Sequence, residues 1–239
     1  LEDTIANKFM LDACLSGAYS EATLHTIQEI LSEYNATINI TESEKELIKE
    51  ASLLNDFLGV NYYASHFLEK YEGESKIVHN GTGEKGTSIF ALKGIGKRVK
   101  NHEVPTTDWD WPIYPKGLFD MLIRIKEEYP NYQTIYITEN GMGYKDEIAD
   151  GKINDTPRIH YIESHLKAIL HAIHNGVNVK GYFLWSLMDV LSWTNGYNKR
   201  YGLFYVDFET QQRFVKKSAC WIKKVSETKM LVDSSVIEY

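Results

Sequence analysis

The chain has 239 residues, of which 43% are hydrophobic and 25% are charged, an ordinary composition for a soluble globular protein. Lys and Arg number 26 against 33 Asp and Glu, and the formal net charge of -7 argues against non-specific binding to nucleic acid. No Lys/Arg-rich amphipathic stretch and no apolar run near the ~20 residues of a membrane span occurs, so a membrane partner is not expected.

Two helices are predicted near the start of the chain. Segment 3–15 spaces its apolar residues, Ile5 and Phe9 among them, as one face of a helix does. A second helix is predicted over 42–52, with Thr41 or Ser43 as its N-cap.

A strand and a long excursion follow. The run from Phe57 to Val60 is short and apolar, which suits a strand buried on both faces. Residues 70–105 are rich in glycine, lysine and polar groups, and they alternate weakly at 76–78 and 88–92. We predict that this segment is an excursion containing a hairpin.

Helices and strands alternate through the rest of the chain. The predicted elements are a helix at 118–129, a strand at 135–138, a helix from Thr156 and Pro157 to a cap at Gly176, a strand at 180–185, a loop with a hairpin at 196–212 and a helix at 216–228. Strands that alternate with helices form βαβ units and a parallel sheet. No linker, repeat or low-complexity tract interrupts the chain, so we expect one unit over 1–239.

The residues of chemical interest all lie just after predicted strands. They are Asn61, Tyr63, Glu139, Asn140, Trp185 and Ser192. Catalytic groups at the carboxyl ends of parallel strands are typical of (β/α)₈ barrels and of doubly wound sheets alike. A dinucleotide-type G-x-G-x-x-G is missing, because no strand, turn and helix surround Gly94 and Gly96. The pattern therefore favours the barrel.

Glu139 is the first candidate for catalysis. It follows the apolar run 135–137 within Thr-Glu-Asn-Gly, and Gly141 behind it would let the backbone turn sharply. A carboxylate at a strand end that faces a cleft can be a nucleophile, a general base or a metal ligand. The plainer interpretation of these four letters is an exposed glutamate that opens a turn.

Three segments together resemble glycoside hydrolase family 1: DFLGVNYY at 56–63, YITENG at 136–141 and GYFLWSLMDVLSWTNGY at 181–197. The resemblance runs in the same order through almost the whole chain. It implies that Glu139 is the nucleophile and that Asn61 and Tyr63 approach the nucleophile and the sugar. Retaining enzymes of this kind hold two carboxyl groups ~5–5.5 Å apart. One attacks the anomeric carbon, and the other protonates the leaving oxygen and later activates water.

A second set of residues, Ser192, Lys199 and Tyr201, resembles the phosphate site of the family's 6-phospho-glycosidases. Members that act on plain glucosides usually carry Glu where this chain has Ser192, and a carboxylate would repel phosphate. A sugar phosphate carries about -1.5 to -2 charges at neutral pH. Lys199 supplies a positive charge, and Tyr201 lies two residues on, so both can face one side of an extended segment. The expected partner is a phosphorylated disaccharide.

Two tryptophans complete the expected sugar site. Trp185 resembles the family's platform for the sugar ring. Trp193 resembles a residue whose NH can meet the axial O4 of galactose, which favours 6-phospho-β-galactosides. The alternative enzyme is a 6-phospho-β-glucosidase.

The resemblance covers only the second half of the family's enzymes. About three strand-helix units and a leading helix are found, whereas a closed barrel needs eight units and ~250 residues. The family's earlier Asn-Glu strand, whose Glu is the general acid/base, has no match here. We therefore expect an α/β fold that is the C-terminal part of a (β/α)₈ TIM barrel, and a need for the missing N-terminal half or for self-association. The alternative is a non-catalytic remnant that binds phospho-sugars or nothing.

No metal or cofactor is expected. Cys14 and Cys220 form no C-x-x-C motif, and two free thiols are typical of a cytoplasmic protein. On the predicted helix His165, His171 and His174 lack the i, i+4 spacing of a metal pair, so we interpret them as surface or packing residues. The segment LEDTIANKFM has no basic region followed by an apolar core, so it is not expected to be a signal peptide.

Overall fold

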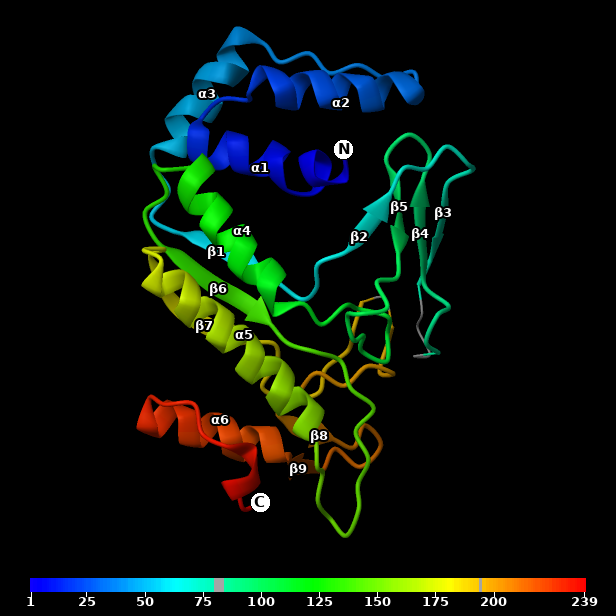
Figure 1. The fold of residues 1–239 in the computed structure, drawn as a ribbon, viewed down its shortest axis with the longest axis vertical. Helices are drawn as coiled ribbons and strands as arrows, with labels where there is room; N and C mark the ends of the chain where they lie inside the picture. Colours follow the sequence, from blue (N-terminus) through cyan, green and yellow to red (C-terminus); the bar gives the residue numbers. More distant parts are fainter. Residues whose placement is uncertain (80–83, 194) are drawn as a thin grey trace.

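The computed structural model describes residues 1–79, 84–193 and 195–239 (Figure 1). The chain opens with one continuous helical segment made of η1 (Thr4–Lys8), α1 (Phe9–Leu11) and η2 (Asp12–Ser16), in which η1 and η2 are π-helical. This confirms the predicted helix at 3–15. α3 (Glu42–Ser52) is confirmed as well, and Thr41 caps it in a capping box with Glu44.

α2 (Glu21–Glu33) was not among the predicted elements. Its N-cap Ser20 accepts the N–H of Thr23, which is an ordinary start signal. Its buried face is narrow, with Thr23, Ile27 and Ile30 as the only buried residues in the helix. A stripe this thin among polar residues gives a weak helical period.

Three parallel strands form the central sheet, in the order β1-β6-β7: β1 (Leu58–Asn61), β6 (Ile135–Asn140) and β7 (Val179–Leu184). The helices between and after them are α4 (Pro115–Glu128), α5 (Thr156–His174) and α6 (Lys217–Thr228). Pro115 and Pro157 lie in the first turns of α4 and α5, and Gly176 follows α5 with a positive φ of 84°. The alternation of strands and helices is as predicted.

The core lies between this sheet and α4 and α5, which pack along it (Figure 1). Ile135 and Ile137 of β6 are fully buried there against Leu118 and Leu122 of α4. The opposite face has no such cover, because Gly59 and Asn61 of β1 are exposed. The prediction that this strand is buried on both faces was therefore wrong. Only one layer of helices covers the sheet in the described residues, and burial on both faces needs a second layer.

The excursion after β1 forms a separate antiparallel sheet in the order β2-β5-β4-β3. Its strands are β2 (Phe67–Glu69), β3 (Lys76–Val78), β4 (Ile89–Leu92) and β5 (Gly96–Val99). The β3–β4 pair confirms the predicted hairpin, and Gly94 makes the left-handed turn into β5. Residues 80–83, which belong to the predicted excursion, lie outside the described residues.

A last hairpin joins β8 (Phe204–Val206) to β9 (Arg213–Val215). Its turn lies at Asp207, whose carboxylate accepts the N–H groups of Glu209 and Thr210. The loop at 196–203 and the strand β8 lie within the predicted range of 196–212, whereas β9 begins at Arg213, just beyond it. The chain ends with the short η3 (Ser234–Val236).

Candidate active site

Glu139 is the next-to-last residue of β6, and Tyr63 lies two residues after the neighbouring strand β1. The Tyr63 hydroxyl donates a hydrogen bond of 2.7 Å to Oε2 of Glu139. Burial, together with the Glu139 carboxylate, raises the pKa of Tyr63 far above its usual range. The phenol therefore stays protonated and remains a hydrogen-bond donor to Glu139.

A buried polar cluster fixes the strand ends that carry this pair. Asn140 is fully buried, and its amide donates to the Tyr62 carbonyl at 2.7 Å and to the Tyr161 hydroxyl at 3.1 Å. The Tyr161 hydroxyl donates to the Tyr63 carbonyl at 2.9 Å, and the Tyr182 hydroxyl donates to Asn140 at 2.7 Å. Through these two tyrosines, α5 and β7 thus fix the backbone at Tyr63 and Asn140.

Asn61 stands opposite Glu139 in the register of β1 and β6. Its side chain accepts a 2.7 Å hydrogen bond from the Thr138 hydroxyl rather than contacting the carboxylate. Asn61 is exposed on the face of the sheet that the helices leave open. The structure therefore brings it to the right strand end, and its expected approach to the sugar stays a prediction.

Trp185 follows β7 at the same end of the sheet, where its backbone N–H donates to the Asn140 carbonyl at 2.9 Å. A Cβ atom on Gly141 would overlap the Trp185 carbonyl oxygen. Gly141 does not have a positive φ, so the predicted sharp turn was the wrong reason for this glycine. Its role is to let the backbones after β6 and β7 approach closely.

Lys199 and Tyr201 lie on the same aromatic cluster as Tyr63. The Lys199 ammonium is 4.6 Å from the ring centre of Trp111 and 5.4 Å from that of Trp109. The Tyr201 ring centre lies 6.4 Å from that of Tyr63 and 6.3 Å from that of Trp111. The two side chains thus face one side of their segment, as predicted, and they share neighbours with the partner of Glu139.

Lys199 is a buried cation, with only 5% of its surface exposed. Burial lowers the pKa of its ammonium from 10.5 to about 8. Within the part of the chain that the structure describes, no carboxylate forms a salt bridge with it. The rings of Trp109 and Trp111 stabilise the charge only partly, so the site remains suited to an anion.

Ser192 and Trp193 lie in the turn before this segment. The Ser192 N–H donates to the Gly196 carbonyl at 2.8 Å, and its hydroxyl contacts the Asn195 side chain at 3.4 Å. Asn195 and Lys199 line the same cavity, which connects Ser192 to the Lys199 site through one neighbour. Trp193 is 100% exposed, so its expected contact with a sugar stays a prediction.

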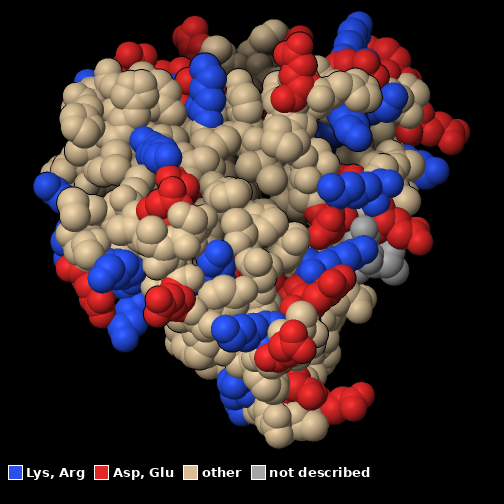
Figure 2. Space-filling model, turned by 60° about the horizontal axis from the view of Figure 1, so that its bottom comes forward, with Lys and Arg blue, Asp and Glu red and all other residues tan. Residues whose placement is uncertain are grey.

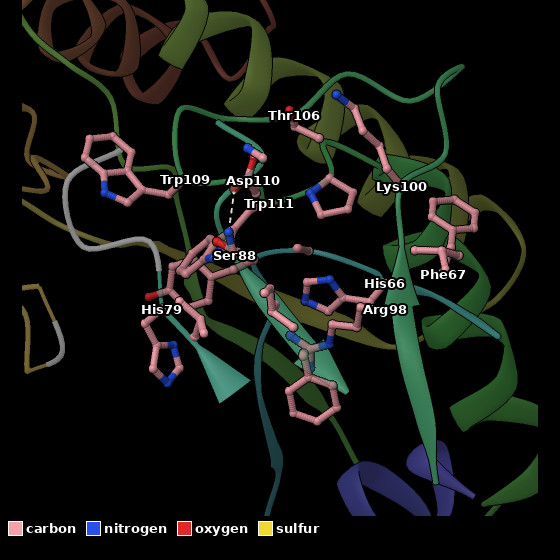
Figure 3. A pocket seen from close by; sticks show the side chains of 18 of the residues that line it. His66, Phe67, His79, Ser88, Arg98, Lys100, Thr106, Trp109, Asp110 and Trp111 are labelled. Carbon is pink, nitrogen blue, oxygen red and sulfur yellow. Dashed lines mark hydrogen bonds between the residues drawn. The ribbon is translucent and has the colours of Figure 1, made fainter. Parts of the chain in front are cut away.

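A cavity of about 740 Å³ lies beside Lys199, between the small sheet and the segment 104–112 (Figure 3). Trp109 and Trp111 line it from that segment, His66 lines it from the position just before β2, and Arg98 lines it from β5. Asp110 accepts the N–H groups of Gly86 at 2.7 Å and of Ser88 at 3.3 Å, which ties the β3–β4 hairpin to the cavity wall. Burial, with a smaller contribution from Arg98, lowers the pKa of His66 to about 4.

Sequence reasoning missed Trp109 and Trp111. Both belong to Thr-Asp-Trp-Asp-Trp-Pro, which places two of the five tryptophans of the chain within three residues. This density in a polar segment was a usable signal, because the flat ring and the N–H of a tryptophan suit a binding site as well as a core.

Among residues 1–79, 84–193 and 195–239, no three His, Cys, Asp or Glu are grouped to hold a metal ion. None of the helices described is long and apolar enough to cross a membrane. On the face that Figure 2 shows, basic and acidic side chains are interspersed rather than gathered in a basic patch. His165 is fully buried against Tyr161, which agrees with the packing role expected for it.

Comparison with known proteins gives consistent matches. The model of glycosyl hydrolase family 1 matches residues 1–231. A protein named 6-phospho-beta-galactosidase from Clostridium acetobutylicum is 68% identical over 239 residues, which is 100% of this chain and 50% of the relative. A protein of the same name from Leptotrichia buccalis is 57% identical over 229 residues, covering 96% of this chain and 49% of the relative. The chain thus spans about half the length of the curated relatives it matches.

Solved structures agree with this result. A β-glucosidase from Exiguobacterium marinum superposes with a TM-score of 0.76 at 31% identity, over 95% of this chain and 46% of that structure. A β-glucosidase from Thermotoga maritima in complex with galacto-hydroximolactam gives a TM-score of 0.74 at 32% identity, over 95% and 45% respectively. The predicted fold, a part of a (β/α)₈ barrel that does not close by itself, is confirmed.

Proposed function

The chain belongs to glycosyl hydrolase family 1, and on this premise we propose that it carries the nucleophile and the phosphate site of a retaining 6-phospho-β-galactosidase. The names of its relatives support the substrate class. The observation in the molecule that carries the proposal is Lys199, a buried cation held next to the Tyr63–Glu139 pair through shared aromatic neighbours.

Glu139 attacks the anomeric carbon in this proposal. Its Oε2 is held by Tyr63, which leaves Oε1 to form the bond to the sugar. The bond between the anomeric carbon and the leaving oxygen breaks as the glycosyl-enzyme forms, and water later releases the sugar. The Tyr63 hydrogen bond orients the carboxylate, which a nucleophile needs.

The general acid/base must come from outside the contacts described above. In the described residues, the contacts of Glu139 and Tyr63 include no second carboxylate. Retaining glycosidases need one ~5–5.5 Å from the nucleophile. The chain spans half the length of its relatives. We therefore propose that a segment corresponding to the other half supplies the general acid/base, in the same polypeptide or as a partner chain.

Lys199 and Tyr201 would bind the phosphate, with Ser192 beside them. The rings of Trp109 and Trp111 lie against the Lys199 ammonium. Lys199 also lines the cavity, and the phosphate would approach the ammonium from there. An ammonium paired with a phosphate makes a charge-assisted hydrogen bond, which is stronger than a neutral one. The phosphate would therefore fix the far end of the sugar while Glu139 reacts at the anomeric carbon.

We propose the galacto configuration rather than the gluco one. The relatives are named for it, and Trp193 has its whole ring free to contact an axial hydroxyl. The gluco epimer is the second candidate, since the superposed structures are β-glucosidases.

The proposal is tested by replacing Lys199 in a complemented protein, made of this chain and the part of the C. acetobutylicum relative that it does not match. Lys199→Ala removes a charge-assisted contact of roughly 1.5–3 kcal/mol, so kcat/KM for a nitrophenyl 6-phospho-β-galactoside should fall about 10- to 100-fold. Hydrolysis of the unphosphorylated galactoside should not change. Lys223→Ala, on the exposed surface of α6, is the matched control. An equal loss on both substrates would show that Lys199 is structural.

The pH dependence of binding gives a separate prediction. Lys199 is charged below its pKa of about 8 and loses its proton above it. A sugar phosphate is a dianion above its second pKa of about 6. KM for the phosphorylated substrate should therefore be lowest between these values and rise up to about tenfold per pH unit above 8. KM for the unphosphorylated substrate, measured in parallel, should not follow this rise. A flat KM from pH 7 to 9.5 would contradict the role of Lys199.

A further inference from the structure

The segment that carries Lys199 and Tyr201 is anchored through the residue between them. Arg200 does not line the cavity, and its guanidinium donates to Asp189 at 2.8 Å and to the Val206 carbonyl at 2.8 Å. Its own carbonyl accepts a hydrogen bond of 2.8 Å from Arg158 and one of 3.0 Å from the Tyr144 N–H. In an extended segment alternate side chains point to opposite sides. Fixing Arg200 therefore fixes the direction of its two neighbours.

Asp189 holds the same segment from the other side. Its carboxylate accepts hydrogen bonds from the Gly202 N–H at 2.9 Å and the Val206 N–H at 3.3 Å, in addition to the one from Arg200. The Lys216 ammonium donates to it at 2.8 Å. Asp189 belongs to the segment after β7, so it ties the Lys199 segment to the segment that also contains Trp185.

Arg158 and Lys216 extend these contacts to the segment after β6. Arg158 lies in the first turn of α5 and grips Asp146 with two hydrogen bonds of 3.0 Å each. Lys216 also donates to Asp146, at 2.6 Å. Arg158 further pairs with Asp155, which accepts the N–H and hydroxyl of Ser218 at the start of α6. Segments after both β6 and β7 thus meet at one buried point.

The charges of this anchor network cancel. It consists of three carboxylates and three cations: Asp146, Asp155, Asp189, Arg158, Arg200 and Lys216. Five of these side chains are at most 1% exposed, and that of Arg200 is 18% exposed. Every carboxylate of the network is engaged by a cation of the network. Lys199 can therefore stand next to it without being neutralised by it.

We propose that the anchor network is a positioning device for the proposed phosphate site, with Arg158 and Arg200 as its positioning residues. The inference rests on the proposed function, because it concerns how Lys199 and Tyr201 are presented to a sugar phosphate. Arg158 holds Asp146, Asp155 and the Arg200 carbonyl at once, through one planar guanidinium. A lysine at position 158 would keep the positive charge, but its ammonium could not make the same planar set of hydrogen bonds.

The test compares two substrates in the complemented protein. In Arg158→Lys we expect KM for a nitrophenyl 6-phospho-β-galactoside to rise roughly 10- to 100-fold, the scale of effect when a binding group is displaced by about an ångström. We expect kcat on that substrate, and both constants on the unphosphorylated galactoside, to stay within about twofold. Asp12→Asn is the matched control, because it alters a buried carboxylate that bonds to Thr23 and Tyr129, outside the network. It should leave the ratio of the two KM values unchanged.

A second variant keeps the test decisive if Arg158→Lys does not fold. Arg200→Lys changes the most exposed member of the network. It should also raise KM for the phosphorylated substrate, because Lys199 and Tyr201 would no longer be held in place. Equal effects on both substrates, unchanged KM values in folded variants, or loss of folding in both variants would overturn the proposal. If the unaltered protein does not prefer the phosphorylated substrate, the proposed function itself has failed, and this result is distinct from the others.

Discussion

Replacing Glu139 by Gln in the complemented protein should reduce kcat by a factor on the order of 10⁶, the scale of loss when a covalent nucleophile is removed. The amide is nearly the same size as the carboxylate and can still accept the 2.7 Å hydrogen bond from Tyr63. It is a poor nucleophile towards the anomeric carbon, because its oxygen carries no negative charge. The fold should remain, so the thermal midpoint and the affinity for substrate should change little.

The control for this experiment is Glu147→Gln. Glu147 lies eight residues further along the chain and is exposed, so its loss should leave kcat unchanged. A 2-fluoro-galactoside 6-phosphate with a good leaving group should glycosylate the unaltered complemented protein at one position, with loss of the leaving group. We expect mass spectrometry of the digest to find the sugar on Glu139. Covalent label on any other carboxylate, or turnover by Glu139→Gln above one per cent of normal, would refute the assignment.

The strand ends of this molecule could be predicted from the sequence because local patterns determine them. Short apolar runs bounded by polar residues placed Glu139 and Tyr63 at strand ends. The structure shows that the two strands are neighbours and that a hydrogen bond joins the two side chains. The extended segment with Lys199 and Tyr201 two residues apart also followed from the period of two. These features depend on few residues that are close in sequence.

Features that depend on distant residues could not be predicted in this way. The anchor network joins Asp146, Arg158, Asp189 and Lys216, and its longest bond links residues 70 positions apart. Nothing in the surroundings of Lys216 in the sequence distinguishes it from a surface lysine, although it is fully buried. The burial of β1 on one face only is also non-local, because it depends on which layers cover the sheet.

The open sheet leads to the prediction with the widest consequence. β1 and β7 are the outer strands of the three-stranded sheet, and each lacks a partner on its outer side in the described residues. Phe57 and Phe183, next to or within these strands, are 54% and 57% exposed, and Leu187 after β7 is 61% exposed. Unpaired strand edges and clustered apolar side chains promote association with another chain. Expressed alone, the 239-residue chain should therefore be poorly soluble or form oligomers, which size-exclusion chromatography would show.

Catalysis should also depend on the part of the relatives that this chain does not match. Without a general acid to protonate the leaving oxygen, hydrolysis of a substrate with a poor leaving group such as lactose 6-phosphate should be slower by about 10²–10⁴-fold. A nitrophenyl substrate, whose leaving group needs little protonation, should suffer less, and this difference separates loss of the acid from loss of the fold. Adding the part of the C. acetobutylicum relative that this chain does not match, fused or as a separate chain, should restore both solubility and activity. The same addition to Glu139→Gln should restore solubility alone, because the sheet edges are covered while the nucleophile is still absent. Efficient hydrolysis of lactose 6-phosphate by the monomeric 239-residue chain would show that the three strands and their helices already contain a complete site.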